Sequence, residues 1–325
     1  MGHFHSKFPR VRLRKSPSKA DGLSANLSVS SRGKSGGGGI SKSVDSVHSS
    51  EAFTPVFTLP DFEEENMTIS QAFDYVIRRP IVSPIMHRPK RILFISGHGM
   101  STLPQLVRLY PEAKIVYYDI YPSTESPTPS AQCQPFSFNI ITDDLPFSDN
   151  TFDLIVLRQA NRALNEERWG SFMRECFRVC RPGGWLEALG QSTGIAKTGP
   201  CGKELLRCLN QVLELDNTSY AAIETLSGVF KTVGFPDPIH KRYQLPVGPW
   251  GGPVGEMVYQ NGRNYFELLI QQLQSVGMHD LAAQFDASID PWERELQNSE
   301  TYMFIHATFA QKPSVKKNTV VGRVC

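Results

Sequence analysis

The sequence predicts an α/β fold in which a mostly parallel sheet is covered by helices on both faces. From Lys90 onward, short apolar strands alternate with segments of helical periodicity, which is the pattern of strands joined by crossover helices. The apolar strand Ile92–Ile95 also runs into a turn of small residues, Ser96-Gly97-His98-Gly99. A chain of 325 residues could hold one large domain or two smaller ones. The alternation places a single domain over about residues 60–312.

The first half of this domain supplies four of the expected strands. They cover residues 91–95, 114–118, 136–139 and 152–157. A helix begins near Thr68 or Ser70 and ends before Pro80. Thr102 is the expected cap of the helix between the first two strands. Another helix is expected over 166–180, because its apolar residues recur at intervals of three and four.

The second half is expected to be more helical. The helix expected over 166–180 ends at Pro182-Gly183-Gly184, and residues 185–189 form a fifth strand. Two helices follow Gly199, a strand covers 239–245, and two further helices cover 263–276 and 279–289. The last strand covers 303–310, before a polar, basic C-terminal tail over 313–325.

Composition narrows the class of protein. Forty per cent of the residues are apolar and 20% are charged, as in a soluble globular protein. No apolar run approaches the roughly 20 residues of a membrane-spanning helix. The six cysteines fit neither a zinc site nor a disulfide scaffold, so no metal is expected. Cys176 and Cys180 lie on an apolar helical face, which indicates buried thiols and a reducing, intracellular compartment.

Residues 1–55 form a Ser/Gly-rich basic tail that we expect to be disordered. Nine Lys/Arg against Asp21 and Asp45 give residues 1–50 a net charge of +7, which leaves −5 for the rest because the total is +2. Met1-Gly2 with Ser6 and Lys7 fits the N-myristoylation pattern, and the basic residues after it could supply a second membrane anchor. The expectation is a cytoplasmic protein held loosely on a membrane through Gly2. A chance match, and a nucleic-acid or nuclear-import role for the tail, are the alternatives; the domain itself is not expected to bind nucleic acid.

Asp119 indicates the kind of cofactor. It stands 20 residues past Gly99, at the end of the second strand, where an acid can accept hydrogen bonds from a ribose. Two later blocks have a recognisable order and spacing, Leu145-Pro146-Phe147-Ser148-Asp149-Asn150 with Phe152-Asp153-Leu154-Ile155, and Arg178 to Glu187. With these blocks, residues 92–190 resemble the class I S-adenosylmethionine-dependent methyltransferases. The resemblance extends weakly to about residue 312.

This resemblance implies a Rossmann-like, seven-stranded, mostly parallel sheet with helices on both faces and extra C-terminal helices. It also implies S-adenosyl-L-methionine as the cofactor. At matching positions, Gly97, His98 and Gly99 would approach the amino-acid part, and Asp119 would hold the ribose. Adenine would lie between Ile120 and Ile140 with Asn139 at its amine edge. Arg158, with its neighbours Leu157 and Gln159, would border the methyl-sulfonium.

The first motif departs from the family pattern. Phe94 stands where the family usually has an acid, and Ser96, His98 and Met100 stand at the three glycine positions. A shift of one residue restores Gly97-x-Gly99 but supplies no acid. The segment Leu245-Pro246-Val247-Gly248-Pro249-Trp250-Gly251 and the end Ala310-Gln311-Lys312-Pro313 are similar to a fungal group of these methyltransferases, often tied to secondary metabolism or regulation.

The resemblance predicts a methyltransferase (EC 2.1.1.-) acting on a small-molecule acceptor that the sequence does not identify. In-line transfer needs positioning more than acid–base help, and no residue is placed by motif as a catalytic base. His240, Tyr243 and Trp250 could line an acceptor pocket or simply fill the core. Two other classes stay open: a non-catalytic regulatory or scaffold protein with the same fold, and a nicotinamide-dependent oxidoreductase.

Overall fold

The computed structural model describes residues 71–97, 100–121, 129–216, 220 and 222–314. By its contacts the chain divides into a unit over Met1–Ala52 and a unit over Phe53–Cys325. The first unit, and with it nearly all of the predicted basic tail, lies outside the described residues. So does the predicted C-terminal tail from residue 315 onward.

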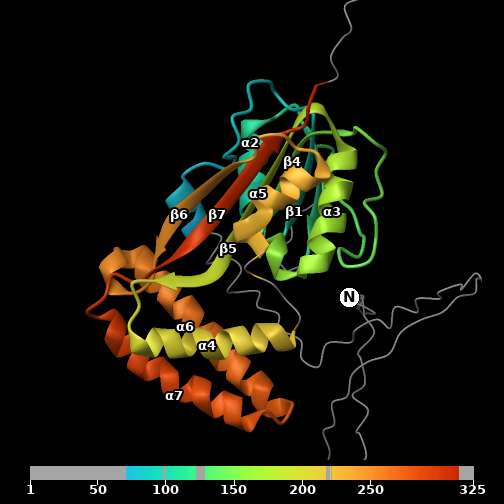
Figure 1. Ribbon diagram of the computed structural model, residues 1–325. Helices are drawn as coiled ribbons and strands as arrows, with labels where there is room; N and C mark the ends of the chain where they lie inside the picture. Colours follow the sequence, from blue (N-terminus) through green and yellow to red (C-terminus); the bar gives the residue numbers. More distant parts are fainter. Residues whose placement is uncertain (1–70, 98–99, 122–128, 217–219, 221, 315–325) are drawn as a thin grey trace, which may run out of the picture. The chain divides into compact units, whose positions relative to one another are not determined.

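The second unit is built on one seven-stranded sheet, seen in Figure 1, with the strand order β3-β2-β1-β4-β5-β7-β6. The strands are β1 (Arg91–Ser96), β2 (Lys114–Asp119), β3 (Cys133–Pro135), β4 (Phe152–Arg158), β5 (Cys180–Ala196), β6 (Ile239–Pro246) and β7 (Tyr302–Gln311). Neighbours among β1 to β5 pair in parallel, whereas β7 runs antiparallel to both β5 and β6. The predicted Rossmann-like, mostly parallel sheet is confirmed.

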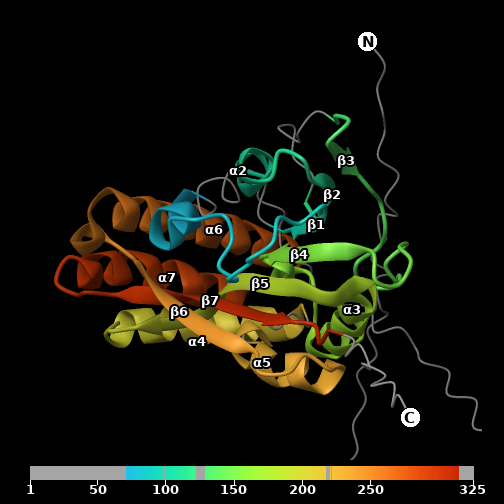
Figure 2. The same ribbon diagram turned by 90° about the horizontal axis from the view of Figure 1, so that it is seen from above.

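Two layers of helices cover the sheet because its buried strands are apolar on both faces. The helices are α2 (Thr102–Leu109), α3 (Glu166–Val179), α4 (Pro200–Leu215), α5 (Ala222–Val233), α6 (Gly252–Ser275) and α7 (His279–Leu296). Phe94 and Val156 pack in the cluster that holds α2, and Ile95 and Leu157 pack in the cluster that holds α3 and α5. Figure 2 shows α2 on one side of the sheet and α3 and α5 on the other.

A third apolar cluster joins α4, α6 and α7 to the antiparallel end of the sheet. Its members include Leu205, Phe266 and Phe285 from the helices and Ile305 and Phe309 from β7. β5 reaches this region because it has 17 residues, continuing past the predicted end at Leu189 to Ala196. No helix in the described part of the chain is long and apolar enough to cross a membrane.

Some predicted elements need correction. The third strand is Cys133–Pro135, not 136–139. Phe136 and Phe138 instead pack on Tyr118, with ring centroids 5.6 and 4.6 Å away, so their apolar alternation reflects ring packing and not strand pairing. Thr102 is not a cap: it is the first buried residue of α2, and Ser101 precedes it without a side-chain cap bond.

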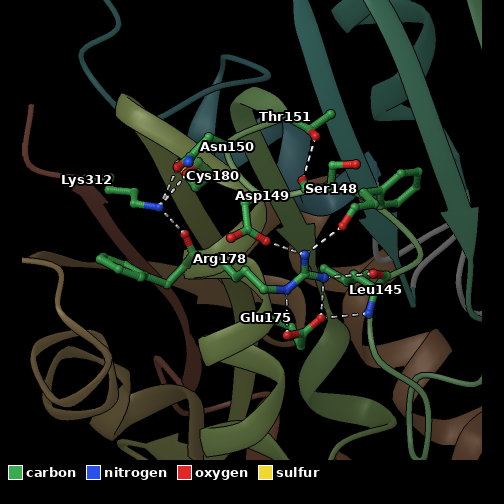
Figure 3. A network of polar contacts seen from close by, with 11 residues as sticks. Leu145, Ser148, Asp149, Asn150, Thr151, Glu175, Arg178, Cys180 and Lys312 are labelled. Atoms are coloured by element: carbon green, nitrogen blue, oxygen red, sulfur yellow. Dashed lines mark hydrogen bonds and ion pairs between the residues drawn. The ribbon is translucent and has the colours of Figure 1, made fainter. Parts of the chain in front are cut away.

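The two blocks on which the resemblance rested are tied together by Arg178 (Figure 3). Its guanidinium donates to both carboxylate oxygens of Glu175 at 2.9 and 2.7 Å and to Asp149 Oδ1 at 2.9 Å. It also donates to the carbonyl oxygens of Leu145 and Phe147. Hydrogen bonds to Glu175 and Asp149 raise the pKa of Arg178, so this cation holds the turn before β4 against α3.

Candidate functional site

The strand order reverses between β1 and β4, and in such sheets ligands bind in the crevice beyond the carboxyl ends of the strands at this point. Gly97, which follows β1, donates its N–H to the carbonyl oxygen of Arg158 at the end of β4, at 2.8 Å. Ser96 is in register with Asp119 at the end of β2. The fold therefore brings Gly97, Asp119 and Arg158 together at the carboxyl ends of β1, β2 and β4, where the resemblance places the cofactor; this place is called the crevice below.

Position 97 requires a glycine because the chain after β1 lies very close to the chain after β4. A Cβ at this position would lie 2.6 Å from the carbonyl oxygen of Gln159 and 3.4 Å from Cδ1 of Ile120. No side chain fits beside a backbone oxygen at that distance. His98 and Gly99, the other predicted residues of this turn, lie outside the described residues.

Asp119 and Ile120 lie where β2 leaves the sheet. The N–H of Ile120 donates to the carbonyl oxygen of Ser96 at 2.7 Å, which fixes the two strand ends side by side. Burial, and to a smaller extent the charge of Asp119, raises the pKa of Tyr118. Asp119 as a whole is half-buried and its two carboxylate oxygens are buried, at the strand end where the resemblance places the ribose.

Asn139 and Ile140 belong to a turn after β3. Asn139 Oδ1 accepts from the N–H of Ile141 at 2.9 Å, and the Asn139 N–H donates to Asp143 at 2.8 Å. Ile140 is buried in the same cluster that Ile120 packs against, so the two predicted adenine neighbours share one apolar region. Their contact with adenine stays a prediction.

Arg158 is committed to contacts within the protein. It is buried, lies 4.0 Å from Glu187 and donates to the carbonyl oxygen of Pro80. Glu187 in turn accepts from the N–H groups of Val82 and Ser83, each at 2.7 Å. Burial lowers the pKa of Arg158 and the charge of Glu187 opposes that shift. This pair anchors residues 80–83 to the sheet, and a contact of Arg158 with the cofactor stays a prediction.

Three amide side chains, two of which the sequence did not single out, cluster after β4 and in the second half of β5. Gln159 is fully buried with a φ of 54°, and its Oε1 accepts from the N–H of Gln191 at 3.1 Å. Asn161 Nδ2 donates to the carbonyl oxygen of Gln191 at 3.0 Å. Gln159 Nε2, Asn161 Oδ1 and Gln191 Oε1 are buried without a hydrogen-bond partner among the described residues. Left-handed backbone and unmatched buried polar atoms are typical of ligand sites.

A cleft that opens to solvent adjoins this cluster at Gln191. Its described lining comes from β5, β7, α4, α6 and α7 with three connecting segments: Arg162, Gln191, Ser192, Thr193, Ile195, Leu209, Leu213, Tyr220, Val247, Val258, Gly262, Tyr265, Phe266, Trp292 and Met303. The mostly apolar lining with a few polar side chains is that of a small-molecule site.

The three residues that the sequence offered for an acceptor pocket do not line this cleft. His240 Nε2 lies 3.1 Å from His306 Nδ1, and His306 Nε2 lies 3.3 Å from Ser192 Oγ. Burial is the main cause that lowers the pKa of His306 to about 4. Trp250 is 43% exposed and donates its Nε1–H to the carbonyl oxygen of Thr301, so it is not a core residue either.

The crevice fits the cofactor that the resemblance implies. Gly97 lets the ends of β1 and β4 approach each other closely, Asp119 offers a carboxylate, and Gln159 Nε2 offers a buried donor that has no partner among the described residues. No group of three or more His, Cys, Asp or Glu among the described residues could hold a metal ion.

Three solved structures illustrate what this chain resembles. The [4+2]-cyclase SpnF is 16% identical with a TM-score of 0.42, over 75% of this chain and 81% of its own. Phosphoethanolamine N-methyltransferase 2 of Haemonchus contortus, with S-adenosyl-L-methionine, is 13% identical with a TM-score of 0.42, over 79% of this chain and only 54% of its own. Mycolic acid cyclopropane synthase CmaA1 is 13% identical with a TM-score of 0.42, over 80% and 91%. Likeness this distant defines neither an activity nor a substrate.

A comparison with curated proteins found no match. A family described as "Methyltransferase domain" matches residues 96–188, from the last residue of β1 into β5. All eight predicted cofactor residues lie inside this segment. Residues 96–188 thus match a methyltransferase domain whose strand ends form the crevice described above.

Proposed function

We propose that this protein transfers a methyl group from S-adenosyl-L-methionine to a small-molecule acceptor. The observation that carries the proposal is the coincidence of the methyltransferase match over 96–188 with the crevice where Gly97, Asp119 and Gln159 meet. When bound, the cofactor would supply an electrophilic methyl group whose carbon–sulfur bond electrons stay with sulfur. The neighbouring cleft would hold the acceptor.

The residues of this chain have separate tasks under this proposal. Asp119 would accept hydrogen bonds from the ribose, and the turn at Gly97 would bring backbone close to the cofactor. Gln159 would donate its unused Nε2–H to the ligand. The apolar cleft would exclude water and hold the nucleophile near the methyl carbon, which is the main source of acceleration for an in-line transfer.

Isothermal titration with S-adenosylmethionine, S-adenosylhomocysteine and NAD tests the cofactor assignment. We expect both sulfur ligands to bind and NAD not to bind. Binding of S-adenosylhomocysteine without any methyl transfer to a broad acceptor panel would favour a regulatory protein that keeps the fold. Phe94 and Met100 are buried in the core under α2, at positions where the family has an acid and a glycine. These two substitutions would then explain the loss of turnover. Binding of NAD alone would favour an oxidoreductase.

We also propose that Gly2 is myristoylated and that the basic tail completes a weak membrane anchor. One acyl chain binds membranes only marginally, and each basic residue near an anionic surface adds about 1 kcal/mol. Lys7, Arg10, Arg12, Arg14 and Lys15 are the nearest basic residues of the tail. Intact mass spectrometry of protein from a eukaryotic host should show the acyl group. An unmodified Gly2 would end this proposal.

A further inference from the structure

Basic side chains gather at the edge of the sheet where the parallel strands begin. Arg91 and Lys114 are paired at the starts of β1 and β2, and the N–H of Lys114 donates to the carbonyl oxygen of Lys90 at 2.8 Å. Arg181 stands at the start of β5, and Arg88 lies in the segment that leads into β1. All five residues are exposed. Because β1, β2, β4 and β5 run parallel, their starts share one edge, and these five residues are called the basic rim below.

Asp153 is a carboxylate built into this rim, and protein groups occupy both of its oxygens. Oδ2 accepts from the N–H groups of Lys90 and Arg91 at 2.6 and 2.7 Å, and Oδ1 pairs with Arg181 at 2.6 Å. Asp153 is buried, whereas Glu112, in the turn before β2, is an exposed acid. Five cations against these two acids leave a net charge of +3 at the rim. The chain after residue 50 sums to −5, so this edge has the opposite sign to the rest of the domain.

An exposed methionine stands beside these cations. Met86 is 91% exposed and lies two residues before Arg88. It also lines a groove between this segment and the start of β5, together with Pro84, Ile85 and Trp185. An apolar side chain next to a row of cations suits a surface that has anionic groups outside and an apolar interior.

The chain also leaves the domain at this rim. The N–H of Gly183 donates to the carbonyl oxygen of Lys312 at 2.9 Å, and the N–H of Lys312 donates to the carbonyl oxygen of Gly184 at 2.8 Å. The last described residue, Ser314, is thus close to the start of β5. After it the sequence holds no acid and three cations, Lys316, Lys317 and Arg323. The segment after Ser314 therefore adds positive charge from a point beside the basic rim.

We propose that the basic rim and Met86 form a docking surface for an anionic lipid membrane. The cations would lie against the anionic headgroups, and Met86 would enter the boundary with the acyl chains. A membrane fits this surface better than a nucleic acid, because contacts with phosphate alone would leave Met86 in water. The inference goes beyond methyl transfer, and it depends neither on the proposed function nor on an acyl group at Gly2.

Docking at the rim would leave the crevice and the cleft facing water. The crevice lies at the carboxyl ends of β1, β2 and β4, which is the opposite edge of the sheet. β5 begins at the rim with Arg181 and lines the cleft only from Gln191 to Ile195. Figure 1 shows α4, α6 and α7, which supply walls of the cleft, at that far end of the sheet. Ligands would therefore enter from the aqueous side.

Sedimentation with lipid vesicles tests the surface on the full chain, made without an acyl group. Five tail cations are replaced by Gln in every sample so that the rim becomes the main cationic surface: Lys7, Arg10, Arg12, Arg14 and Lys15. We expect binding to phosphatidylcholine vesicles that contain about one third phosphatidylserine, and none to phosphatidylcholine alone. Equal binding to both kinds of vesicle, or binding to neither, would overturn the proposal.

A triple variant of the rim tests the location. Arg88→Gln, Lys90→Gln and Arg91→Gln together should weaken binding to the phosphatidylserine vesicles by about 100-fold, because each cation near an anionic surface contributes about fivefold. Its urea midpoint should match that of the unaltered rim, since the three side chains are exposed. Unchanged affinity in the folded triple variant would show that the rim does not meet the membrane.

A matched control removes the same number of charges elsewhere. Arg79, Lys203 and Arg294 are exposed, and the last two lie on α4 and α7. Replacing all three by Gln should change the affinity by less than about threefold, because charges more than a Debye length from the membrane are screened. Equal weakening by the control and by the rim variant would mean that net charge, and not this edge of the sheet, determines binding.

Met86→Gln tests the apolar contact and leaves the charge unchanged. Met86 is almost fully exposed, so folding should not change, and the loss of its insertion should weaken vesicle binding by about tenfold. Full affinity in this variant would remove Met86 from the surface and overturn the proposal as stated. A short DNA duplex is the competing polyanion: binding to DNA that the rim variant abolishes, without binding to vesicles, would assign the rim to nucleic acid instead.

Discussion

The substitution Gly97→Ala probes the tightest point of the crevice. The added Cβ would lie 2.6 Å from the carbonyl oxygen of Gln159, whereas real Cβ contacts do not fall under 3.0 Å. The opposing atom belongs to the backbone, and Gln159 is held by its N–H bond to the carbonyl oxygen of Leu189 at 2.7 Å. The ends of β1 and β4 must therefore separate by at least about 0.4 Å, and overpacking of this kind costs about 1–3 kcal/mol.

The displacement falls where the cofactor would lie, so two quantities should change together. Urea unfolding should show a loss of about 1–3 kcal/mol in the free energy of unfolding. Calorimetry on the folded variant should show weaker binding of S-adenosylhomocysteine. Gly262→Ala is the control because its Cβ meets no atom closer than 3.9 Å, and replacing a helical glycine should stabilise α6 by about 0.5–1 kcal/mol.

A stable Gly97→Ala protein that binds S-adenosylhomocysteine like wild type would refute this reasoning. It would mean that the ends of β1 and β4 are free to separate and that the cofactor does not contact this turn. A variant that loses stability but keeps full affinity would confine the role of Gly97 to packing.

Other perturbations have equally definite outcomes. Asp119→Ala should weaken the binding of S-adenosylhomocysteine by roughly 1.5–3 kcal/mol, the range for a lost hydrogen bond to a charged group, with little effect on folding. Calorimetry on the folded variant measures this, and undiminished affinity would remove Asp119 from the site. Arg178→Met should lower the free energy of unfolding by about 1–3 kcal/mol, because Glu175 and two backbone carbonyl groups lose their donor, and the urea midpoint would report it. His306 has a pKa of about 4 in the folded protein against 6.5 unfolded, so the unfolded chain takes up the extra proton as the pH falls. Stability should therefore decrease from about pH 7 to pH 4, and His306→Gln should make that decrease shallower; an equally steep decrease would mean that other groups cause it.

Local sequence pattern was sufficient to predict most of the fold. Strands such as 91–95 and 152–157 are continuous apolar runs bounded by turn residues, and their ends fall within a residue of β1 and β4. The prediction was wrong in segments whose amino-acid composition is compatible with two different local structures. Phe136 and Phe138 alternate like a strand but pack as rings, and Gly252-Pro253 has the composition of a loop but forms the first turn of α6.

The crevice was partly predictable because the residues after β1, β2 and β4 must converge once the sheet is parallel. Gln191 and Asn161 were not, because their role depends on the register between β4 and β5, which no local pattern encodes. The cleft could not be predicted from the sequence at all. Its walls come from elements between Arg162 and Met303, and a single apolar residue such as Val258 or Leu213 has no feature that separates wall from core.

The length of β5 has an evolutionary consequence. The methyltransferase match ends at Ala188, and of the cleft-lining residues that the structure describes all except Arg162 come after it. The first half of β5 thus belongs to the methyltransferase match, and its second half lines the proposed acceptor cleft. Under the proposed function, substitutions in the helices that follow β5 would change the acceptor that the cleft takes and leave the proposed donor-binding residues, which all precede β5, unchanged.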